Sequence, residues 1–347
     1  MEVGMTGWAE LTRRSLDELR TTDETYRPTN FWGPGVDRLL SEMETIGLEK
    51  FKSWPSAPIW FYPMYGNGWT EATLAKALQS AKQVNPRADQ GYFYNSLNGW
   101  FEARRDFDVA MMAWDQHRWP FDIGGHGESK VGSPWQAFGG VPGGSAQFGR
   151  AYANYLLLLA ALSRHVDRPP TSFLEIGGGF GVLGEIVRTR DPQARYVDLD
   201  IPPLLTVASY YLTELFGADS VTVYDPQTAA RGPISVPECG VLPNFRIEDL
   251  DAQFDVFVNS FSFQEMEPPV VDHYIGQVCD KGITYAVSLN SREGKPKAAQ
   301  AGDWGALDPV KSADIIDMFD RHGLELVGQY DTPLVRSAGQ VNVFRRR

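Results

Sequence analysis

Short apolar segments of strand length alternate with helical patterns through the second half of this chain. We expect strands at Ser172–Ile176, Arg195–Leu199, Val221–Tyr224, Gly240–Leu242, Phe254–Asn259 and Ile283–Leu289. The helical patterns between them cover Val182–Thr189, Leu204–Phe216 and Pro268–Cys279. This alternation predicts an α/β fold with a parallel, doubly wound sheet, because each helix returns the chain to the same edge.

The last part of the chain departs from this alternation. A helical pattern at Ser312–His322 is followed by two strand patterns, Leu324–Tyr330 and Gln340–Arg345, with only a loop between them. Two strands that are joined without a helix must pair antiparallel. We therefore expect the sheet to end in an antiparallel hairpin.

The first 144 residues differ in composition from the rest. Nine of the ten tryptophans lie between Trp8 and Trp135, among loops rich in glycine and proline and short helical patterns. We expect a mainly helical, aromatic-rich N-terminal region, 1–144. It either covers the second half as a cap or uses its rings to fill a core.

A second domain, 145–347, is expected to follow. Ser145 is the expected N-cap of a helix over Phe148–His165. Because this helix is apolar on all sides, we expect it to be buried between layers.

Charge and cysteine content limit the functions that the chain can have. It carries 32 Lys and Arg against 44 Asp and Glu, a formal net charge of −12, which argues against a nucleic-acid partner. Cys239 and Cys279 allow at most one disulfide and no zinc cluster, which favours a reducing compartment. The longest apolar run, Tyr155–Leu162, is shorter than a membrane span. We expect a soluble cytoplasmic protein without a membrane partner, and a homo-oligomer stays open.

A glycine cluster follows the first expected strand. Leu174–Gly184 contains Gly-Gly-Gly-Phe-Gly and leads directly into a helix. Glycines permit a tight turn and a close approach of the backbone to a ligand, and the helix offers free N–H groups. The pattern Gly179-x-Gly181-x-x-Gly184, with Asp200 about 20 residues further on, fits either a dinucleotide or S-adenosylmethionine.

Three features favour S-adenosylmethionine. Glu175 lies at the end of the strand, and its anion would repel a pyrophosphate but attract the ammonium of a methionine moiety. The expected C-terminal hairpin is typical of class I methyltransferases, whereas dinucleotide-binding sheets end parallel. The glycine loop also begins late in the chain, as expected behind an N-terminal cap that binds the substrate.

Several segments resemble one family. The chain is similar to sugar O-methyltransferases, a family of class I S-adenosylmethionine-dependent methyltransferases, in Leu174–Gly181, Asp200–Pro202 and Asn259–Met266. Val131–Pro134 and the helix from Ser145 to Leu162 are similar to the segment before the glycine loop in that family. The resemblance implies methyl transfer from S-adenosylmethionine to a hydroxyl of a sugar-like or glycosylated natural product, within secondary metabolism. The implied partner is a small-molecule acceptor.

The expected cofactor site lies at the carboxyl ends of the strands. Its residues are Glu175, Gly177, Gly179, Gly181, Asp200 and Asn259. Glu175 and the glycines should line the methionine half, and Asp200 can accept both ribose hydroxyl protons. We expect Asp198 to point to the opposite face of the sheet, and Leu242 or its neighbours to flank the adenine.

The expected base follows the fourth strand. A sugar hydroxyl is a poor nucleophile at neutral pH, so a base within hydrogen-bond reach should accelerate the transfer by ~10²–10⁴-fold. Gln264 and Glu265 lie at the carboxyl edge, where open α/β sheets bind ligands. Glutamine is not a useful proton acceptor, so we expect Glu265 to be the base or to orient the hydroxyl. The alternative is an acid that stabilises the start of the next helix.

Two histidines complete the candidate catalytic residues. His126 lies in a glycine-rich loop that could close over the acceptor, and the alternative is a plain surface loop. His273 lies off the apolar stripe of its helix, so solvent exposure is its alternative. Glu265, Glu267 and Asp272 could supply oxygen ligands, but their spacing is not diagnostic and we predict no metal.

Other functions stay open. The aromatic-rich N-terminal region would also suit a flat phenol or indole acceptor, methylated at oxygen or carbon. A NAD(P)-dependent oxidoreductase is a second class, and a non-catalytic protein that binds the methyl donor is a third.

Overall fold

The computed structural model describes residues 5–66, 71–87, 98–122, 125–139, 146–229, 232–331 and 339–347. Within these residues, one large sheet has the strand order β5-β6-β4-β3-β7-β8-β10-β9. The strands are β3 (Ser172–Ile176), β4 (Arg195–Asp200), β5 (Val221–Val223), β6 (Cys239–Pro243), β7 (Val256–Ser260), β8 (Tyr285–Ser291), β9 (Leu324–Asp331) and β10 (Gly339–Arg346). Strands β3 to β8 pair parallel, and β10 pairs antiparallel with both β8 and β9. This confirms the expected α/β fold, with a parallel, doubly wound, Rossmann-like sheet that ends in an antiparallel hairpin.

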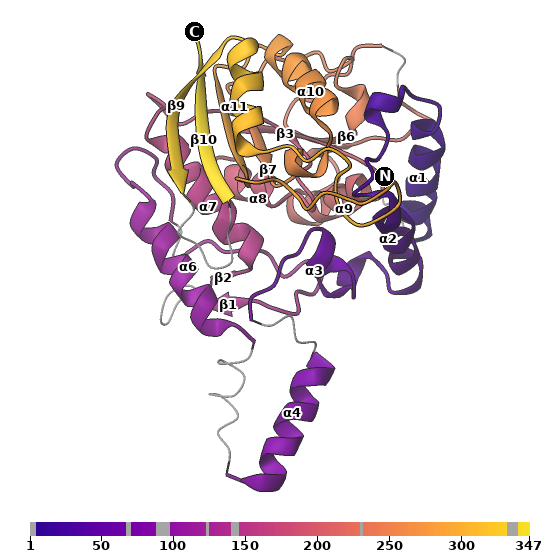
Figure 1. The fold of residues 1–347 in the computed structure, drawn as a ribbon, viewed down its shortest axis with the longest axis vertical. Helices are drawn as coiled ribbons and strands as arrows, with labels where there is room; N and C mark the ends of the chain where they lie inside the picture. The colour runs from indigo at the N-terminus through magenta and orange to yellow at the C-terminus, as the bar shows by residue number, and fades with distance from the viewer. Residues whose placement is uncertain are drawn as a thin grey trace.

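Helices cover both faces of the sheet (Figure 1). One face carries α7 (Arg150–Ser163), α8 (Val182–Arg190) and α9 (Leu204–Phe216), and the other carries α10 (Pro268–Asp280) and α11 (Ser312–Arg321). Side chains that alternate along the strands pack into two hydrophobic cores, one on each face of the sheet. Phe173 and Tyr196 belong to the first core, and Leu174 and Val197 belong to the second. Because both faces are buried, these strands are apolar without interruption in the sequence.

The long apolar helix is α7, and it is shorter than expected. It begins at Arg150, after Gly149, and ends at Ser163, and every residue after Arg150 is buried. The expected N-cap, Ser145, lies outside the described residues. The outer side of α7 is covered by α6 (Trp100–Ala113), so the expected burial is confirmed.

The N-terminal region is mainly helical. Its elements are α1 (Met5–Leu19), η1 (Glu24–Tyr26), α2 (Gly33–Thr45), η2 (Leu48–Ser53), α3 (Ala57–Trp60), α4 (Glu71–Val84) and α6, with a short antiparallel pair of β1 (Phe138–Gly139) and β2 (Gln147–Phe148). Helix α1 packs against α9, where the hydroxyls of Thr12 and Thr206 are 2.6 Å apart. Helix α4 projects from the body of the molecule (Figure 1).

A buried ion pair joins this region to α8. Lys52 Nζ lies 2.7 Å from Glu128 Oε1 and donates to the hydroxyl of Tyr211 and the carbonyl of Ser129. The Tyr211 hydroxyl and the Ser129 N–H in turn donate to Glu185 of α8, each at 2.7 Å. Burial raises the pKa of Glu185 to about 7. Because this network is buried, we infer that its role is structural and that it holds the N-terminal region against α8.

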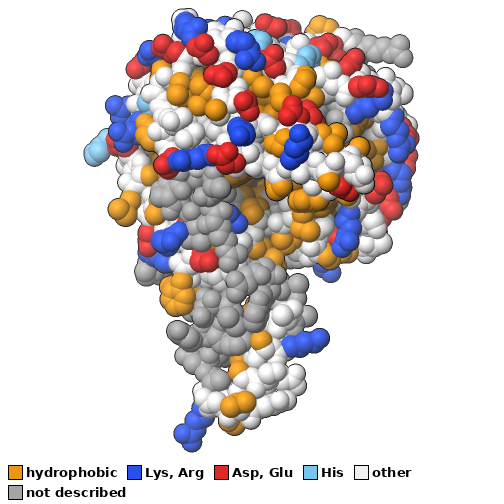
Figure 2. All heavy atoms as spheres, in the orientation of Figure 1, with side chains coloured by type: hydrophobic (Ala, Val, Ile, Leu, Met, Phe, Trp, Pro, Cys, Tyr) orange, Lys and Arg blue, Asp and Glu red, His pale blue; other side chains and the backbone are white. Residues whose placement is uncertain are grey.

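The surface carries charges of both signs, which are interspersed over the face in Figure 2. Within the described ranges, no helix combines the length and apolar character that crossing a membrane requires. Cys239 and Cys279 are both free thiols.

Close packing of α8 on the sheet gives a testable consequence. A Cβ at Gly184 would lie 2.5 Å from the ring of Tyr196, which is fully buried. We expect Gly184→Val to lower the free energy of unfolding by about 1–3 kcal/mol, because overpacking forces neighbours to move. Gly33→Ala is the control, since a Cβ there has no atom within 4 Å. Equal stability of the two variants in urea unfolding would contradict this packing.

Candidate functional site

A cavity of about 260 Å³ opens at the carboxyl ends of β3, β4 and β7. It is lined by the glycine loop, one face of α7, the segment 25–32, the α3 region and Lys295 in the connection after β8. Open α/β sheets bind ligands in this position. This cavity is the candidate functional site.

The glycine loop forms part of the cavity wall. Gly177 and Gly179 line it, with positive φ angles of +72° and +66°. A Cβ at Gly177 would collide with Ser262, whereas one at Gly179 would meet only Phe61, at 3.6 Å. Gly181 does not line the cavity, because it is the residue from which α8 begins. Two of the three expected glycines therefore face the site, and the third serves the helix.

Two buried aspartates end β4. Asp200 lines the cavity and accepts hydrogen bonds from the N–H groups of Gly179 and Ile201, at 3.0 and 2.7 Å. Asp198 accepts a hydrogen bond from the Gly178 N–H at 3.0 Å. The expectation that Asp198 points to the opposite face is wrong, because residues two apart in a strand share a face. Burial raises the pKa of both aspartates.

Glu175, at the end of β3, lies behind the cavity wall. Its side chain is fully buried and accepts hydrogen bonds from the hydroxyls of Tyr155 and Tyr196, at 2.5 and 2.6 Å. Tyr155 itself lines the cavity, so it separates Glu175 from that space. Burial raises the pKa of Glu175 to about 7, although the hydrogen bonds from the two tyrosine hydroxyls lower it in part.

These three acids share one edge without a counter-ion. Glu175 and Asp198 are direct partners in the β3–β4 ladder, and Asp200 follows on the same face. Among the described residues, no Lys, Arg or His forms an ion pair with any of the three. The edge therefore favours a cationic ligand.

Asn259 also lies behind the wall. Its Nδ2 donates to Ser262 Oγ at 2.6 Å, and its Oδ1 accepts from the Phe263 N–H and from Asn290 Nδ2, at 3.2 and 2.8 Å. These bonds fix the loop after β7, where Phe261 has a positive φ of 63°. Asn259 shapes the cavity from behind and does not line it.

Two asparagines that the sequence analysis missed line the cavity. Asn244, in η3 (Asn244–Arg246), donates to the Tyr26 carbonyl and the Tyr274 hydroxyl, while its Oδ1 is buried without a partner. Asn154 of α7 is 6 % exposed and has no hydrogen-bond partner within the described residues. A buried polar atom without a partner costs free energy, so the Asn244 Oδ1 favours a ligand that supplies one. The amide of Asn154 lines the cavity and can bond to a ligand there. Asn244 could have been found from its place just after Leu242, whereas no pattern marks Asn154.

Glu265 lines the cavity at the end of η4 (Phe263–Glu265). Its Oε1 lies 2.9 Å from Lys295 Nζ, and its Oε2 accepts a hydrogen bond from the Trp32 indole N–H at 3.0 Å. The Thr29 hydroxyl donates to its backbone carbonyl at 2.6 Å. Burial raises the pKa of Glu265 to about 7, while Lys295 and Trp32 act in the opposite direction. A carboxyl group that titrates near neutral pH thus faces the cavity.

Gln264 lines the cavity beside Glu265. Its Oε1 accepts the Ser291 N–H at 2.7 Å, and its Nε2 has no hydrogen-bond partner in the described part of the chain. The site therefore has a free amide donor next to the carboxyl group.

Aromatic side chains form another wall. Trp32 and Trp60 line the cavity, with ring centroids 4.8 Å apart, and Trp304 packs 5.4 Å from Trp60. Trp54 and Trp119, in contrast, are fully buried away from the cavity. Tryptophans of the N-terminal region therefore both line the cavity and fill a hydrophobic core.

Neither candidate histidine lines the cavity. His126 is exposed, stacks on Phe121 and lines a separate depression with Arg190. His273 is half-buried on α10, and its Nε2 lies 2.9 Å from the Tyr26 hydroxyl. We leave both out of the mechanism, because a histidine in another depression or bound to Tyr26 does not reach this space. Within the described residues, no group of three or more His, Cys, Asp or Glu side chains is arranged to hold a metal.

No family model matches the chain, and no curated protein matches its sequence. The pyocyanin biosynthetic protein PhzM aligns at 17% identity and a TM-score of 0.38 over 56% of this chain and 58% of its own. Mitomycin 7-O-methyltransferase MmcR aligns at 17% identity and a TM-score of 0.38 over 57% of this chain and 58% of its own. Magnesium protoporphyrin IX methyltransferase ChlM from Synechocystis PCC 6803, with bound SAM, aligns at 12% identity and a TM-score of 0.40 over 56% of this chain and 79% of its own.

This chain thus spans less than two thirds of the length of PhzM and of MmcR.

The raised pKa of Glu175 makes stability depend on pH. The folded protein holds the Glu175 proton up to about pH 7, whereas the unfolded chain releases it near its ordinary value of 4.5. The free energy of unfolding should therefore fall as pH rises through this window. Glu175→Gln should reduce that fall by on the order of 3 kcal/mol, measured by urea unfolding at several pH values.

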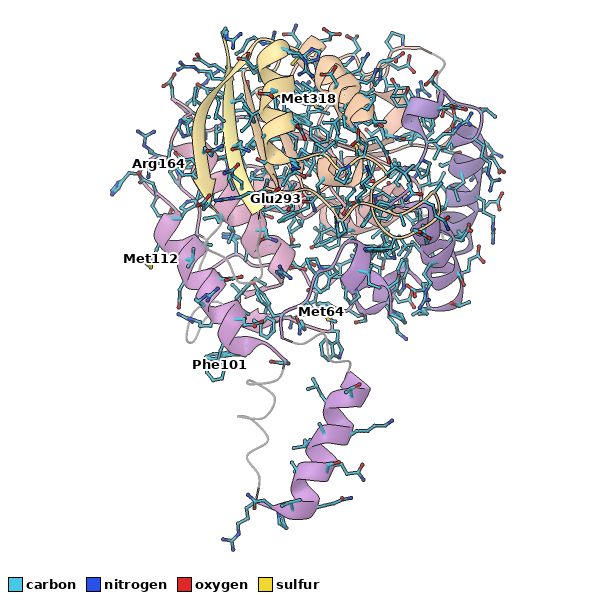
Figure 3. All side chains as sticks on the ribbon, viewed as in Figure 1. Met64, Phe101, Met112, Arg164, Glu293 and Met318 are labelled. Atoms are coloured by element: carbon cyan, nitrogen blue, oxygen red, sulfur yellow. The ribbon has the colours of Figure 1, made fainter. Side chains whose placement is uncertain are left out.

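The control for this experiment is Glu293→Gln. Glu293 lies exposed in the connection after β8 (Figure 3) and should leave the pH dependence unchanged. An unaltered pH dependence in Glu175→Gln would mean that the pKa of Glu175 is the same in the folded protein as in the unfolded chain, which would contradict its raised value.

Proposed function

We propose that this chain is an S-adenosylmethionine-dependent methyltransferase that methylates a hydroxyl of a sugar-like small-molecule acceptor. Three buried carboxyl groups carry this proposal, because Glu175, Asp198 and Asp200 lie at one sheet edge without a paired cation among the described residues, and Asp200 lines the cavity. S-adenosylmethionine brings a sulfonium and an ammonium group to such an edge. A diphosphate would be repelled there, which argues against a NAD(P)-dependent oxidoreductase.

The unpaired groups of the cavity suggest where the cofactor lies. Asp200 keeps free lone pairs after accepting two N–H groups, and these can accept the ribose hydroxyls. The unpartnered Oδ1 of Asn244 suits the exocyclic amine of adenine. The methionine part then lies over Gly177 and Gly179, where the absence of a Cβ permits close approach, with its ammonium toward Tyr155, behind which Glu175 is buried. Gly181 and Asn259 act by fixing the two loops.

Glu265 is the proposed base. The bound cofactor would supply an activated methyl group on sulfur. Glu265 accepts the proton of the acceptor hydroxyl as the oxygen bonds to the methyl carbon and the carbon–sulfur bond breaks. The products are a methyl ether, S-adenosylhomocysteine and a proton on Glu265. Alignment of the reactants supplies much of the acceleration, and the base contributes ~10²–10⁴-fold.

The acceptor wall combines ring faces with free amides. Trp32 and Trp60 can stack on a sugar ring, and Asn154 and the Nε2 of Gln264 can bond to its hydroxyls. A flat phenol or indole, methylated at oxygen or carbon, is the second candidate, favoured by the same tryptophans. It would leave the amides with fewer partners. We propose that residues 1–144 supply much of the acceptor wall and that residues 145–347 bind the cofactor.

Cofactor binding tests this proposal without an acceptor. We expect S-adenosylhomocysteine to bind in isothermal titration calorimetry. Asp200→Ala and Asn244→Leu should each weaken it about tenfold or more, because a buried hydrogen bond is lost. Asp219→Ala, which removes an exposed acid, is the control. Binding of NADH in place of S-adenosylhomocysteine would contradict the proposal.

The role of Glu265 is tested by activity. Labelled S-adenosylmethionine and an extract of the source organism should yield a labelled product that mass spectrometry identifies. In Glu265→Gln we expect the rate to fall by ~10²–10⁴-fold, with unchanged affinity for S-adenosylhomocysteine. A variant as fast as the parent would show that another group takes the proton.

A further inference from the structure

Lys295 reaches the cavity on the connection between β8 and α11, residues 292–311. Asn30 of the N-terminal region holds this connection, since its Nδ2 donates to the carbonyls of Asp303 and Gly305, each at 2.9 Å. Figure 1 shows the connection extending to the N-terminal helices. The contacts around Glu265 therefore form only when three parts of the chain are docked together.

The geometry around Lys295 is that of a buried ion pair. Its Nζ lies 2.9 Å from Glu265 Oε1 and 4.3 Å from the centre of the Phe31 ring. The side chain of Lys295 is 23% exposed and that of Glu265 is 11% exposed. In such a place a lone carboxyl group keeps its proton, whereas an ammonium within hydrogen-bond distance favours the carboxylate.

Other charged or titratable groups also line this cavity. They are Arg27, Arg150, Tyr155, Asp200 and Tyr274. Among the described residues, only Lys295 forms an ion pair with Glu265. The carboxylate of Glu265 raises the pKa of Asp200, because two like charges in one cavity are unfavourable.

We propose that Lys295 is a positioning residue that keeps Glu265 ionised and fixes its orientation toward the acceptor. The proposal rests on the proposed role of Glu265 as the base. It adds that this base is complete only when the connection 292–311 is docked on the N-terminal region. A carboxylate held in this way can take up the acceptor proton at neutral pH.

Trp32 provides a probe that needs no acceptor, because its indole N–H donates to Glu265 Oε2. With nitrogen-15 in the indole groups, the Trp32 signal can be identified from Trp32→Phe and followed by NMR between about pH 5 and pH 9. We expect Lys295→Met to raise the midpoint of this titration by about one pH unit or more. Lys295→Arg should restore a midpoint near that of the parent. Lys297→Met, on an exposed residue of the same connection, is the control and should change nothing.

An unchanged midpoint in Lys295→Met would overturn the proposal. So would a Trp32 signal that still titrates in Glu265→Gln, where the titration should disappear. If Lys295→Met loses its dispersed indole signals and is unfolded, Lys295→Gln serves for the same comparison. Calorimetry with S-adenosylhomocysteine on the same samples separates the two claims. Binding with an unchanged midpoint contradicts the role of Lys295 alone, and absence of binding in the parent contradicts the methyltransferase proposal.

Discussion

The burial of three carboxyl groups at one edge of the sheet is the constraint on which the rest of the structure depends. Removing a charge from water is costly unless donors replace the lost hydration. Backbone N–H groups of the glycine loop donate hydrogen bonds to Asp198 and Asp200. The hydroxyls of Tyr155 and Tyr196 donate hydrogen bonds to Glu175. These hydrogen bonds lower the free-energy cost of burying the carboxyl groups, but none of the three forms an ion pair with a cation among the described residues. The edge is therefore suited to a cationic ligand, and the cavity opens beside it.

The site is assembled from distant parts of the chain. Glu265 follows β7, Trp32 comes from the N-terminal region, and Lys295 comes from the connection between β8 and α11. Asn244 joins the N-terminal region to the cavity wall, because its amide donates to the Tyr26 carbonyl while its Oδ1 is buried without a partner. The N-terminal region is thus tied both to the proposed cofactor side and to the proposed acceptor side of the cavity.

Local patterns in the sequence predicted most of the fold. Strand β3 and helix α9 have the expected bounds, and the other strands of the large sheet differ by one or two residues at an end, because an apolar run between turn residues is a local signal. The short pair of β1 and β2 was not predicted. The positions of Asp200 and Glu265 at the cavity also followed from the sequence, since the ends of parallel strands meet at one edge. The alternation of strand side chains was misapplied to Asp198, which shares a face with Asp200.

The rest depends on contacts between residues far apart in the sequence. Lys295 and Asn154 carry no motif, and their proximity to the cavity appears only when the connection after β8 and helix α7 are in place. His126 was predicted at the site but lies in a separate depression. Its glycine-rich loop carries no sequence signal for the side of the molecule on which it lies. Gly181 fits the glycine pattern but serves the start of α8.

The most direct measurement is a crystal structure of the protein with S-adenosylhomocysteine. This account expects the adenine amine at Asn244 Oδ1, the ribose hydroxyls at Asp200, and the sulfur facing the same space as Glu265. A cavity that stays empty at saturating ligand, or a ligand diphosphate lying along Gly177 and Gly179, would contradict it.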